Sequence, residues 1–319
     1  MAGTIRLVSG TASKDFTQKI HDSLQEESVK TRIIETEIGK FPDGETKVQI
    51  KETVRGYHIY VIQSTCPPVN DNLIQLCLII DALRRASAKS ITAVVPYFGY
   101  ARQEKRGAYR MPISAKVAAK FIEESGVDRV LTMDLHSEAI PGFFDIPTDN
   151  LMALPIFSDY FRQLLPNLNS VVTVSPDAGG TARARAFAEA LGTPLAIIEK
   201  RRNPETGKVT VFNVIGRVNG KTAIIIDDII SSGTTLVEAA GLLHKEGAED
   251  VWSGVIHGIF SGNAVKTIES SQLKRVVVSD TVPLQKQSSM LKQISVTGIF
   301  ADTIRRIQEN RSVSTLFLK

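Results

Sequence analysis

The chain of 319 residues is too long for one small domain, and at roughly 100–200 residues per domain its length predicts two. Hydrophobic residues make up 43% of the chain and charged residues 23%, which excludes disordered, collagen-like and coiled-coil proteins. The 38 Lys and Arg against 34 Asp and Glu leave a net charge of +4. That charge is too small for a protein that coats nucleic acid, so we expect no nucleic-acid partner.

Short runs rich in β-branched residues alternate along the chain with longer stretches of helical period, a pattern typical of βα units. Because the strands are almost continuously apolar, they predict parallel sheets that helices cover on both faces. We therefore expect an α/β fold with doubly wound sheets. The elements predicted, in chain order, are strand Ile5–Ser9, helix Asp15–Leu24, strand His58–Gln63, helix Asn72–Ala86, strand Ser90–Val95, helix Ile113–Glu124, strand Arg129–Asp134, helix Ile156–Leu165, strand Val171–Ser175, helix Thr181–Leu191, strands Pro194–Glu199 and Thr222–Asp227, helix Thr235–Glu246, and strands Val251–Ile256 and Arg275–Asp280.

Residues 142–150 interrupt the alternation, so we expect one domain over residues 1–150 and a second over residues 151–319. The two cysteines, Cys66 and Cys77, provide neither a disulfide framework nor a paired metal motif. No stretch reaches the roughly 18 to 20 apolar residues that span a bilayer, and no signal-peptide region precedes the first strand. These features predict a cytoplasmic protein without a membrane partner.

The chemistry of the chain concentrates in residues 222–236, where a buried strand leads into Asp227 and Asp228, then a loop of Ser, Gly and Thr, then a helix. Hydroxyls and backbone N–H groups at the positive end of a helix suit a phosphate monoester. Carboxylates at the carboxyl edge of the strand can accept hydrogen bonds from sugar hydroxyls. The segment therefore predicts a site for a phosphorylated sugar, although a strand end and a helix cap alone would look similar.

This segment resembles the ribose-phosphate motif of type I phosphoribosyltransferase folds, and further motifs resemble the ribose-phosphate pyrophosphokinase family over essentially the full length. The resemblance implies two doubly wound parallel-sheet domains of type I phosphoribosyltransferase-like fold. It also implies that the anomeric hydroxyl of ribose 5-phosphate attacks the β-phosphorus of MgATP, which yields AMP and phosphoribosyl pyrophosphate for nucleotide biosynthesis. The motifs are Phe41–Glu45, Val69–Leu73, Pro96–Gln103, Thr132–His136, Val174–Gly180, His257–Gly262 and Ser312–Phe317.

For the nucleotide, the resemblance implies a site made mainly by the first half, partly across subunits of dimers that assemble into a hexamer. An Asp-Gly pair alone would indicate only a turn. A guanidinium after a strand can bind phosphate oxygens with two hydrogen bonds, which agrees with the ATP role implied for arginine. The implied ATP-binding residues are Phe41, Asp43, Gly44, Glu45, Arg102, Gln103 and His136.

For the metal, the resemblance implies Mg²⁺ held by His136 and Asp177, and few protein ligands are expected because phosphates and waters complete its shell. For catalysis it implies Lys200 and Arg202, whose charges would stabilise the transferring group. Residues 203–208 are expected to form a loop that closes over the site. Arg202 is also assigned to ribose 5-phosphate, together with Asp227, Asp228, Ser231, Ser232, Gly233, Thr234 and Thr235.

The phosphate loop departs from the family pattern, in which an acidic residue is usual at Ser231 and a Gly-Thr pair at Thr234-Thr235. Two alternatives to the kinase hypothesis therefore stay open. The loop alone favours a phosphoribosyltransferase, but the ATP-side motifs oppose it. A non-catalytic relative that joins synthetase oligomers is the other alternative, and the retained Lys200 and Arg202 oppose that one.

Overall fold

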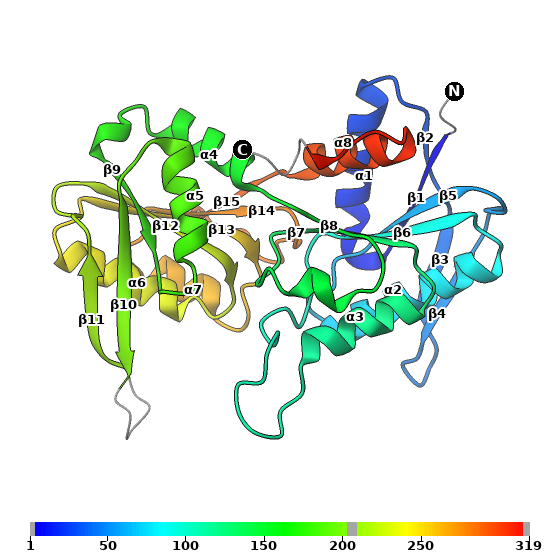
Figure 1. The fold of residues 1–319 in the computed structure, drawn as a ribbon, viewed down its shortest axis with the longest axis horizontal. Coiled ribbons are helices and arrows are strands. Elements are labelled where there is room, and N and C mark those ends of the chain that lie inside the picture. Colours follow the sequence, from blue (N-terminus) through cyan, green and yellow to red (C-terminus); the bar gives the residue numbers. More distant parts are fainter. Residues whose placement is uncertain (1–3, 203–208, 315–319) are drawn as a thin grey trace. The chain divides into compact units, whose positions relative to one another are not determined.

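The computed structural model describes residues 4–202 and 209–314, with side chains in these ranges except those of residues 200–202 and 209–212. The described residues form two compact units (Figure 1). The first unit contains residues up to Met152 together with Asp280–Pro283 and the segment that begins at Ser295. The second contains Ala153–Ser279 and Leu284–Ile294. The expected boundary near residue 150 does not foresee that the C-terminal segment folds with the first unit.

The first unit is built on a six-stranded sheet in the order β2-β1-β5-β6-β7-β8. All its neighbouring strands are parallel, as expected from their apolar character. The strands are β1 (Ile5–Ser9), β2 (Thr31–Ile33), β5 (His58–Ile62), β6 (Ser90–Val95), β7 (Arg129–Met133) and β8 (Thr148–Leu151).

Helices cover both faces of this sheet, α1 (Lys14–Glu26) and α8 (Thr297–Gln308) on one side, α2 (Val69–Arg85) and α3 (Ser114–Glu124) on the other (Figure 1). Helix α1 buries an apolar stripe at helical spacing, and the Phe16 ring meets the edge of Phe300 from α8 at 5.3 Å between centroids. A separate antiparallel hairpin, β3 (Thr36–Lys40) and β4 (Thr46–Ile50), packs on α2. Two short 3-10 turns, η1 (Thr11–Ser13) and η2 (Ile140–Phe143), complete the unit.

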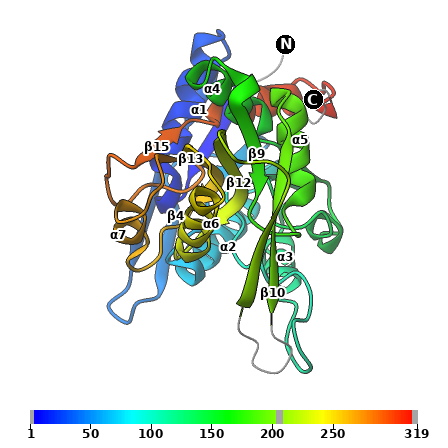
Figure 2. The ribbon, with the colours of Figure 1, turned by 90° about the vertical axis from the view of Figure 1, so that its left-hand side faces the viewer.

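The second unit is built on a seven-stranded sheet in the order β11-β10-β9-β12-β13-β14-β15, parallel except for the β10–β11 pair. Figure 2 shows α5 (Thr181–Leu191) on one side of this sheet and α6 (Thr234–Lys245) and α7 (Ala264–Glu269) on the other. Helix α4 (Leu154–Leu164) packs on α5, and the 3-10 turn η3 (Leu168–Ser170) directly precedes the first strand of this sheet in the chain. The strands are β9 (Val171–Ser175), β10 (Leu195–Arg202), β11 (Val209–Ile215), β12 (Thr222–Ile230), β13 (Asp250–Gly258), β14 (Arg275–Ser279) and β15 (Leu291–Ile294).

Apart from β11, the two sheets share one strand order, which confirms the predicted pair of doubly wound α/β units. The final helix of each half is exchanged: α4 follows β8 of the first unit but packs on α5 of the second, and α8 follows β15 of the second but packs on α1 of the first. None of the helices in the described part of the chain combines the length and apolar character needed to cross a bilayer.

Candidate active site

The second sheet has a topological switch point between β9 and β12, where the order in which the chain fills the sheet reverses. From β9 the chain passes to β10 on one side, and it later returns to β12 on the other side of β9. In open α/β sheets, ligands bind outside the carboxyl ends of the strands at such a switch point. The residues that follow β9 and the residues at the end of β12 meet this condition, and both segments were predicted as site residues from the sequence.

Asp227 and Asp228, called the acid pair below, lie inside β12 because this strand continues to Ile230, three residues beyond the predicted end. The side chain of Asp228 is only 5% exposed, whereas that of Asp227 is 29% exposed. The backbone N–H of Asp228 donates to Asp227 Oδ1 at 2.9 Å. The pair is therefore fixed in relative position before any ligand binds.

Arg183, in the first turn of α5, is a cation that faces the acid pair. Its Nη1 lies 3.3 Å from Asp228 Oδ1 and 3.8 Å from Asp227 Oδ1. Burial raises the pKa of Asp227, the negative charge of Asp228 raises it further, and the charge of Arg183 acts in the opposite direction. The two neighbouring carboxylates repel each other, and the Arg183 guanidinium offsets part of this repulsion.

The phosphate loop, Ser231–Thr235, follows directly and leads into α6, which begins at Thr234. Gly233 occupies the N-cap position with a φ of 77°, a left-handed conformation that favours glycine. Because glycine has no side chain to cap the helix, the first N–H groups of α6 are available for an anion. The hydroxyl of Ser232 donates to Thr234 Oγ1 at 3.3 Å, which keeps the loop hydroxyls together.

The segment between β13 and α7 supports the phosphate loop. The Ser231 and Ser261 hydroxyl oxygens are 2.9 Å apart, and the Ser261 N–H donates to the Ser231 carbonyl at 3.0 Å. Phe260 has a φ of 48°, and the Gly258 backbone lies so close to the Phe260 ring that an added Cβ would approach it to 2.6 Å. This strained, packed segment holds the loop from one side.

Asp177 lies in the turn between β9 and α5. Its carboxylate Oδ1 accepts the Gly180 N–H at 3.0 Å, and its carbonyl accepts the Ser175 hydroxyl at 2.7 Å. The side chain is exposed, and its carboxylate has the oxygen chemistry that Mg²⁺ prefers. Among the described residues no group of three or more His, Cys, Asp or Glu gathers as a metal cage. This donor set fits a Mg²⁺ ion that keeps its waters and takes further ligands from substrate phosphates.

His136, the other predicted metal ligand, lies in the first unit. It is exposed and comes three residues after the last residue of β7. The turn before it is held by Asn150, whose Oδ1 accepts the Leu135 N–H at 3.1 Å. Asp134 adopts a left-handed φ of 41° there. His136 and Asp177 are thus presented by the carboxyl ends of strands in different units.

Arg102 and Gln103 are exposed and lie beyond the carboxyl end of β6. The Gln103 side chain accepts a hydrogen bond of 2.5 Å from Ser114, and its carbonyl accepts the Ala115 N–H at 3.3 Å, so it is anchored to the start of α3. The exposed Arg102 side chain is carried by this anchored turn.

Residues 41–45 form the turn of the β3–β4 hairpin. The Phe41 N–H donates to the Glu45 carbonyl at 2.8 Å, and the Asp43 carboxylate accepts the Glu45 N–H at 3.1 Å. Gly44 has a φ of 94°, which favours glycine. The Phe41 ring is 47% exposed, so it presents an aromatic face to solvent.

The predicted catalytic residues Lys200 and Arg202 end β10, where the backbone pairs with β11 and the register shifts between Arg201 and Arg202. Their side chains, and the predicted loop at residues 203–208, lie outside the described residues. Arg183 and Ser261 were not predicted. The signal for Arg183 is its place on the first helical turn after a glycine-rich strand end, where its side chain can reach back over the sheet edge.

Comparison with known proteins extends this picture. Residues 5–126 match the N-terminal domain of ribose phosphate pyrophosphokinase, and residues 200–318 match the phosphoribosyl synthetase-associated domain. The chain is 45% identical over 315 residues to ribose-phosphate pyrophosphokinase 2 of Enterococcus faecalis, covering 98% of this chain and 96% of the relative. It is 44% identical over 313 residues to the ribose-phosphate pyrophosphokinase of Campylobacter jejuni, covering 98% and 99%. The crystal structure of phosphoribosylpyrophosphate synthetase from Mycobacterium smegmatis superposes with a TM-score of 0.90 at 34% identity, covering 97% of this chain and 100% of that chain.

Proposed function

The chain belongs to the ribose-phosphate pyrophosphokinase family, and we propose that its second unit holds ribose 5-phosphate while side chains of its first unit hold ATP. The enzyme makes phosphoribosyl pyrophosphate. The anomeric oxygen of ribose 5-phosphate forms a bond to the β-phosphorus of ATP, the bond from that phosphorus to the bridging oxygen of the α-phosphate breaks, and AMP leaves.

The observation that carries this assignment of sites is the acid pair followed by the phosphate loop at the switch point of the second sheet. The loop hydroxyls and the uncapped N–H groups of α6 suit the 5-phosphate, and the acid pair suits the ring hydroxyls. A phosphoribosyltransferase would need the same loop. The match to pyrophosphokinases over 98% of the chain, however, includes the ATP-side segments that such an enzyme does not require.

For the nucleotide, we propose that Phe41 covers the adenine while Asp43, Gly44 and Glu45 contact the base or its ribose. Arg102 and Gln103 would bind the phosphates. The exposed Phe41 ring and the exposed Arg102 guanidinium support these roles because both side chains are available to a ligand.

Bound Mg²⁺ would neutralise charge on the triphosphate, with Asp177 and His136 as its proposed protein ligands. Lys200 and Arg202 are proposed to stabilise the negative charge that spreads over the migrating diphosphoryl group and the leaving oxygen. Because this transfer needs little covalent help from the protein, positioned cations are the main catalytic contribution that the chain can make.

The test measures AMP release from MgATP with and without ribose 5-phosphate, and base-dependent consumption of phosphoribosyl pyrophosphate in parallel. We expect AMP release only with ribose 5-phosphate, and about a hundredfold lower kcat in Lys200→Ala or Arg202→Ala. Asp228→Asn should raise KM for ribose 5-phosphate about tenfold or more and leave KM for ATP unchanged. Base-dependent consumption instead would support the transferase, and neither activity would support a non-catalytic relative.

We also infer that the chain self-associates, with dimers assembling to a hexamer, and that the enzyme works in the cytoplasm. Helices α2 and α3 support self-association because they present large apolar side chains to solvent, with exposures from 38% for Leu78 to 51% for Phe121. Between them lies a pocket of about 240 Å³, lined by Leu73, Tyr100, Pro112, Ser114, Val117, Ala118 and Phe121.

A further inference from the structure

Arg183 is the residue of the second unit whose role the sequence motifs leave unassigned. It is the third residue of α5 and comes six residues after the exposed Asp177, and its side chain is only 20% exposed. Arg185, on the same helix, is fully on the solvent side. One arginine of this helix is therefore directed into the site and the other away from it.

The geometry at Arg183 is that of one cation facing two adjacent carboxylates. Its Nη1 lies 3.3 Å from Asp228 Oδ1 and 3.8 Å from Asp227 Oδ1. Two carboxylates on neighbouring residues repel each other, and the nearly buried Asp228 loses most of its hydration. A guanidinium offers several donors in a rigid plane, so one side chain can hold both oxygens in fixed places.

Arg183 also joins the two segments that flank the switch point. It belongs to the helix that follows β9 and the Asp177 turn, whereas the acid pair belongs to β12. Beyond the paired register of β9 and β12, which ends at Ile225↔Val174, the contact to Arg183 ties the end of β12 to α5. A cation in this place fixes the distance between the Asp177 turn and the acid pair.

We propose that Arg183 is a positioning residue for ribose 5-phosphate, which holds the Asp227 and Asp228 carboxylates in the orientation that accepts the sugar hydroxyls. The inference rests on the proposed assignment of the acid pair to ribose 5-phosphate. Arg183 acts through the two carboxylates, so its loss should weaken sugar binding selectively rather than binding of the nucleotide.

The experiment compares two variants of Arg183. Arg183→Met keeps the apolar part of the side chain, and Arg183→Lys keeps the positive charge but lacks the planar guanidinium donors. Arg185→Met serves as the matched control on the same helix. KM for ribose 5-phosphate, KM for ATP, kcat and the thermal midpoint are measured for each. We expect R183M to raise KM for ribose 5-phosphate about tenfold or more, R183K to raise it about threefold, and R185M to leave it unchanged, with KM for ATP constant throughout.

Equal changes in both KM values, or no change in either, would overturn the proposal, and so would an R183K enzyme no better than R183M. If R183M fails to fold, the R183K enzyme provides the test. An unchanged KM for ribose 5-phosphate in R183K would contradict the requirement for the planar guanidinium donors. Asp228→Asn, measured in parallel, separates the two levels of the argument. If D228N weakens ribose 5-phosphate binding and R183M does not, only the role of Arg183 is lost. If D228N has no effect, the assignment of the acid pair itself is wrong.

Discussion

Burial and the adjacent charge of Asp228 raise the pKa of Asp227 from 3.8 to about 8. A carboxyl group with a raised pKa in the folded state binds its proton more tightly when folded, so its contribution lowers stability as pH rises between these two values. We expect Asp227→Asn to raise the free energy of unfolding at neutral pH by about 1–3 kcal/mol while it weakens ribose 5-phosphate binding.

Denaturant unfolding of the ligand-free protein at pH 5 and pH 8 checks this. The gain of the Asn variant over the parent should be larger at pH 8, since more of the parent carboxyl is charged there. Asp43→Asn, in the exposed hairpin turn, is the control and should show no pH-dependent difference. An equal gain at both pH values would contradict the expected link to ionisation.

Variants of Ser231 and Ser261 can test whether the hydrogen bond between their hydroxyls stabilises the phosphate loop for ligand binding. Their hydroxyls are 2.9 Å apart, and a hydrogen bond of this kind contributes about 1 kcal/mol. We expect Ser261→Ala to raise KM for ribose 5-phosphate about fivefold, and the double variant with Ser231→Ala to be no worse than the poorer single variant. Ser270→Ala, whose hydroxyl donates to the Thr267 carbonyl of its own helix end, is the control for the cycle. Additive effects in the double variant would rule out direct coupling.

Among the secondary-structure elements, the largely buried strands were predicted best from the sequence. Strands Ile5–Ser9, Ser90–Val95 and Val171–Ser175 have the predicted bounds because each apolar run is followed directly by Gly or Pro. The β3–β4 hairpin was not predicted, since its residues alternate between half-buried and exposed and carry many charges. β12 is longer than predicted because Ile229 and Ile230 pair with His257 and Gly258 beyond the acid pair.

The first sheet has a switch point of its own, between β1 and β5, and side chains of the unit fill it. Gln63 is fully buried, with Oε1 accepting the Ala12 N–H at 3.2 Å. Its Nε2 donates to Asn72 at 3.1 Å and to Gln75 at 3.0 Å. An added Cβ at Gly10 would lie 2.1 Å from Gln63 Oε1, so glycine is needed there. The network thus joins the turn η1 after β1, the residue that follows β5, and α2, at the place that corresponds to the proposed ligand site of the second unit.

Removal of the Gln63 hydrogen-bond network should lower the free energy of unfolding. We expect Gln63→Ala to lower the free energy of unfolding by about 2–4 kcal/mol, because it leaves a cavity and several buried polar groups without their partner. Gln49→Ala, on the exposed face of the hairpin, should change it by less than about 0.5 kcal/mol. Guanidinium denaturation of both variants measures their free energies of unfolding. A Gln63 variant as stable as the Gln49 control would show that the network makes no net contribution to stability.

For the whole molecule, the sequence predicted two doubly wound α/β units, but not the exchange of helices α4 and α8. Periodicity is a local signal and does not say which sheet a terminal helix covers. Asp280 shows how the exchange is fixed: Lys19 of α1 contacts its carboxylate at 2.9 Å, and its other oxygen accepts the Val296 N–H at 2.9 Å. Such contacts between distant parts of the chain leave no pattern in the sequence.

Self-association can be tested on the face that α2 and α3 expose. We expect Phe121→Glu to shift the particle to a smaller species, because a charge placed in an apolar interface loses its hydration. Light scattering coupled to size exclusion measures the mass, and Glu124→Gln at the end of α3 is the control. An unchanged mass for the Phe121 variant would place the interface elsewhere.

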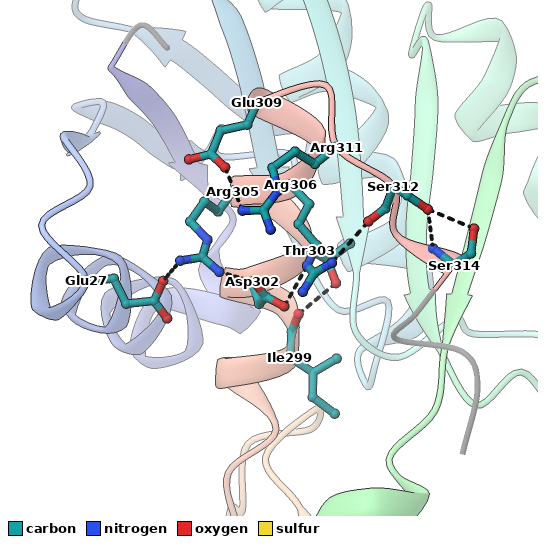
Figure 3. Close-up of polar contacts among 10 residues, drawn as sticks. All are labelled: Glu27, Ile299, Asp302, Thr303, Arg305, Arg306, Glu309, Arg311, Ser312 and Ser314. Carbon is teal, nitrogen blue, oxygen red and sulfur yellow. Dashed lines mark hydrogen bonds and ion pairs between the residues drawn. The ribbon is translucent and has the colours of Figure 1, made fainter. Parts of the chain in front are cut away.

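The exchange also predicts that the last helix stabilises the first unit. Phe300 of α8 is fully buried against Phe16, and Figure 3 shows Arg305 in ion pairs with Glu27 next to α1 and with Asp302 of its own helix. We expect Phe300→Ala to lower the free energy of unfolding by about 3–5 kcal/mol, since it opens a large cavity between α1 and α8. Hydrogen exchange should show the loss of protection first in α1 and β1, at the opposite end of the sequence, and not in α5 or β9.

Glu309→Ala, at the exposed end of α8, should leave both protection and stability near the parent values. Loss of protection confined to the second unit would mean that α8 stabilises the half of the chain it follows rather than the half it covers.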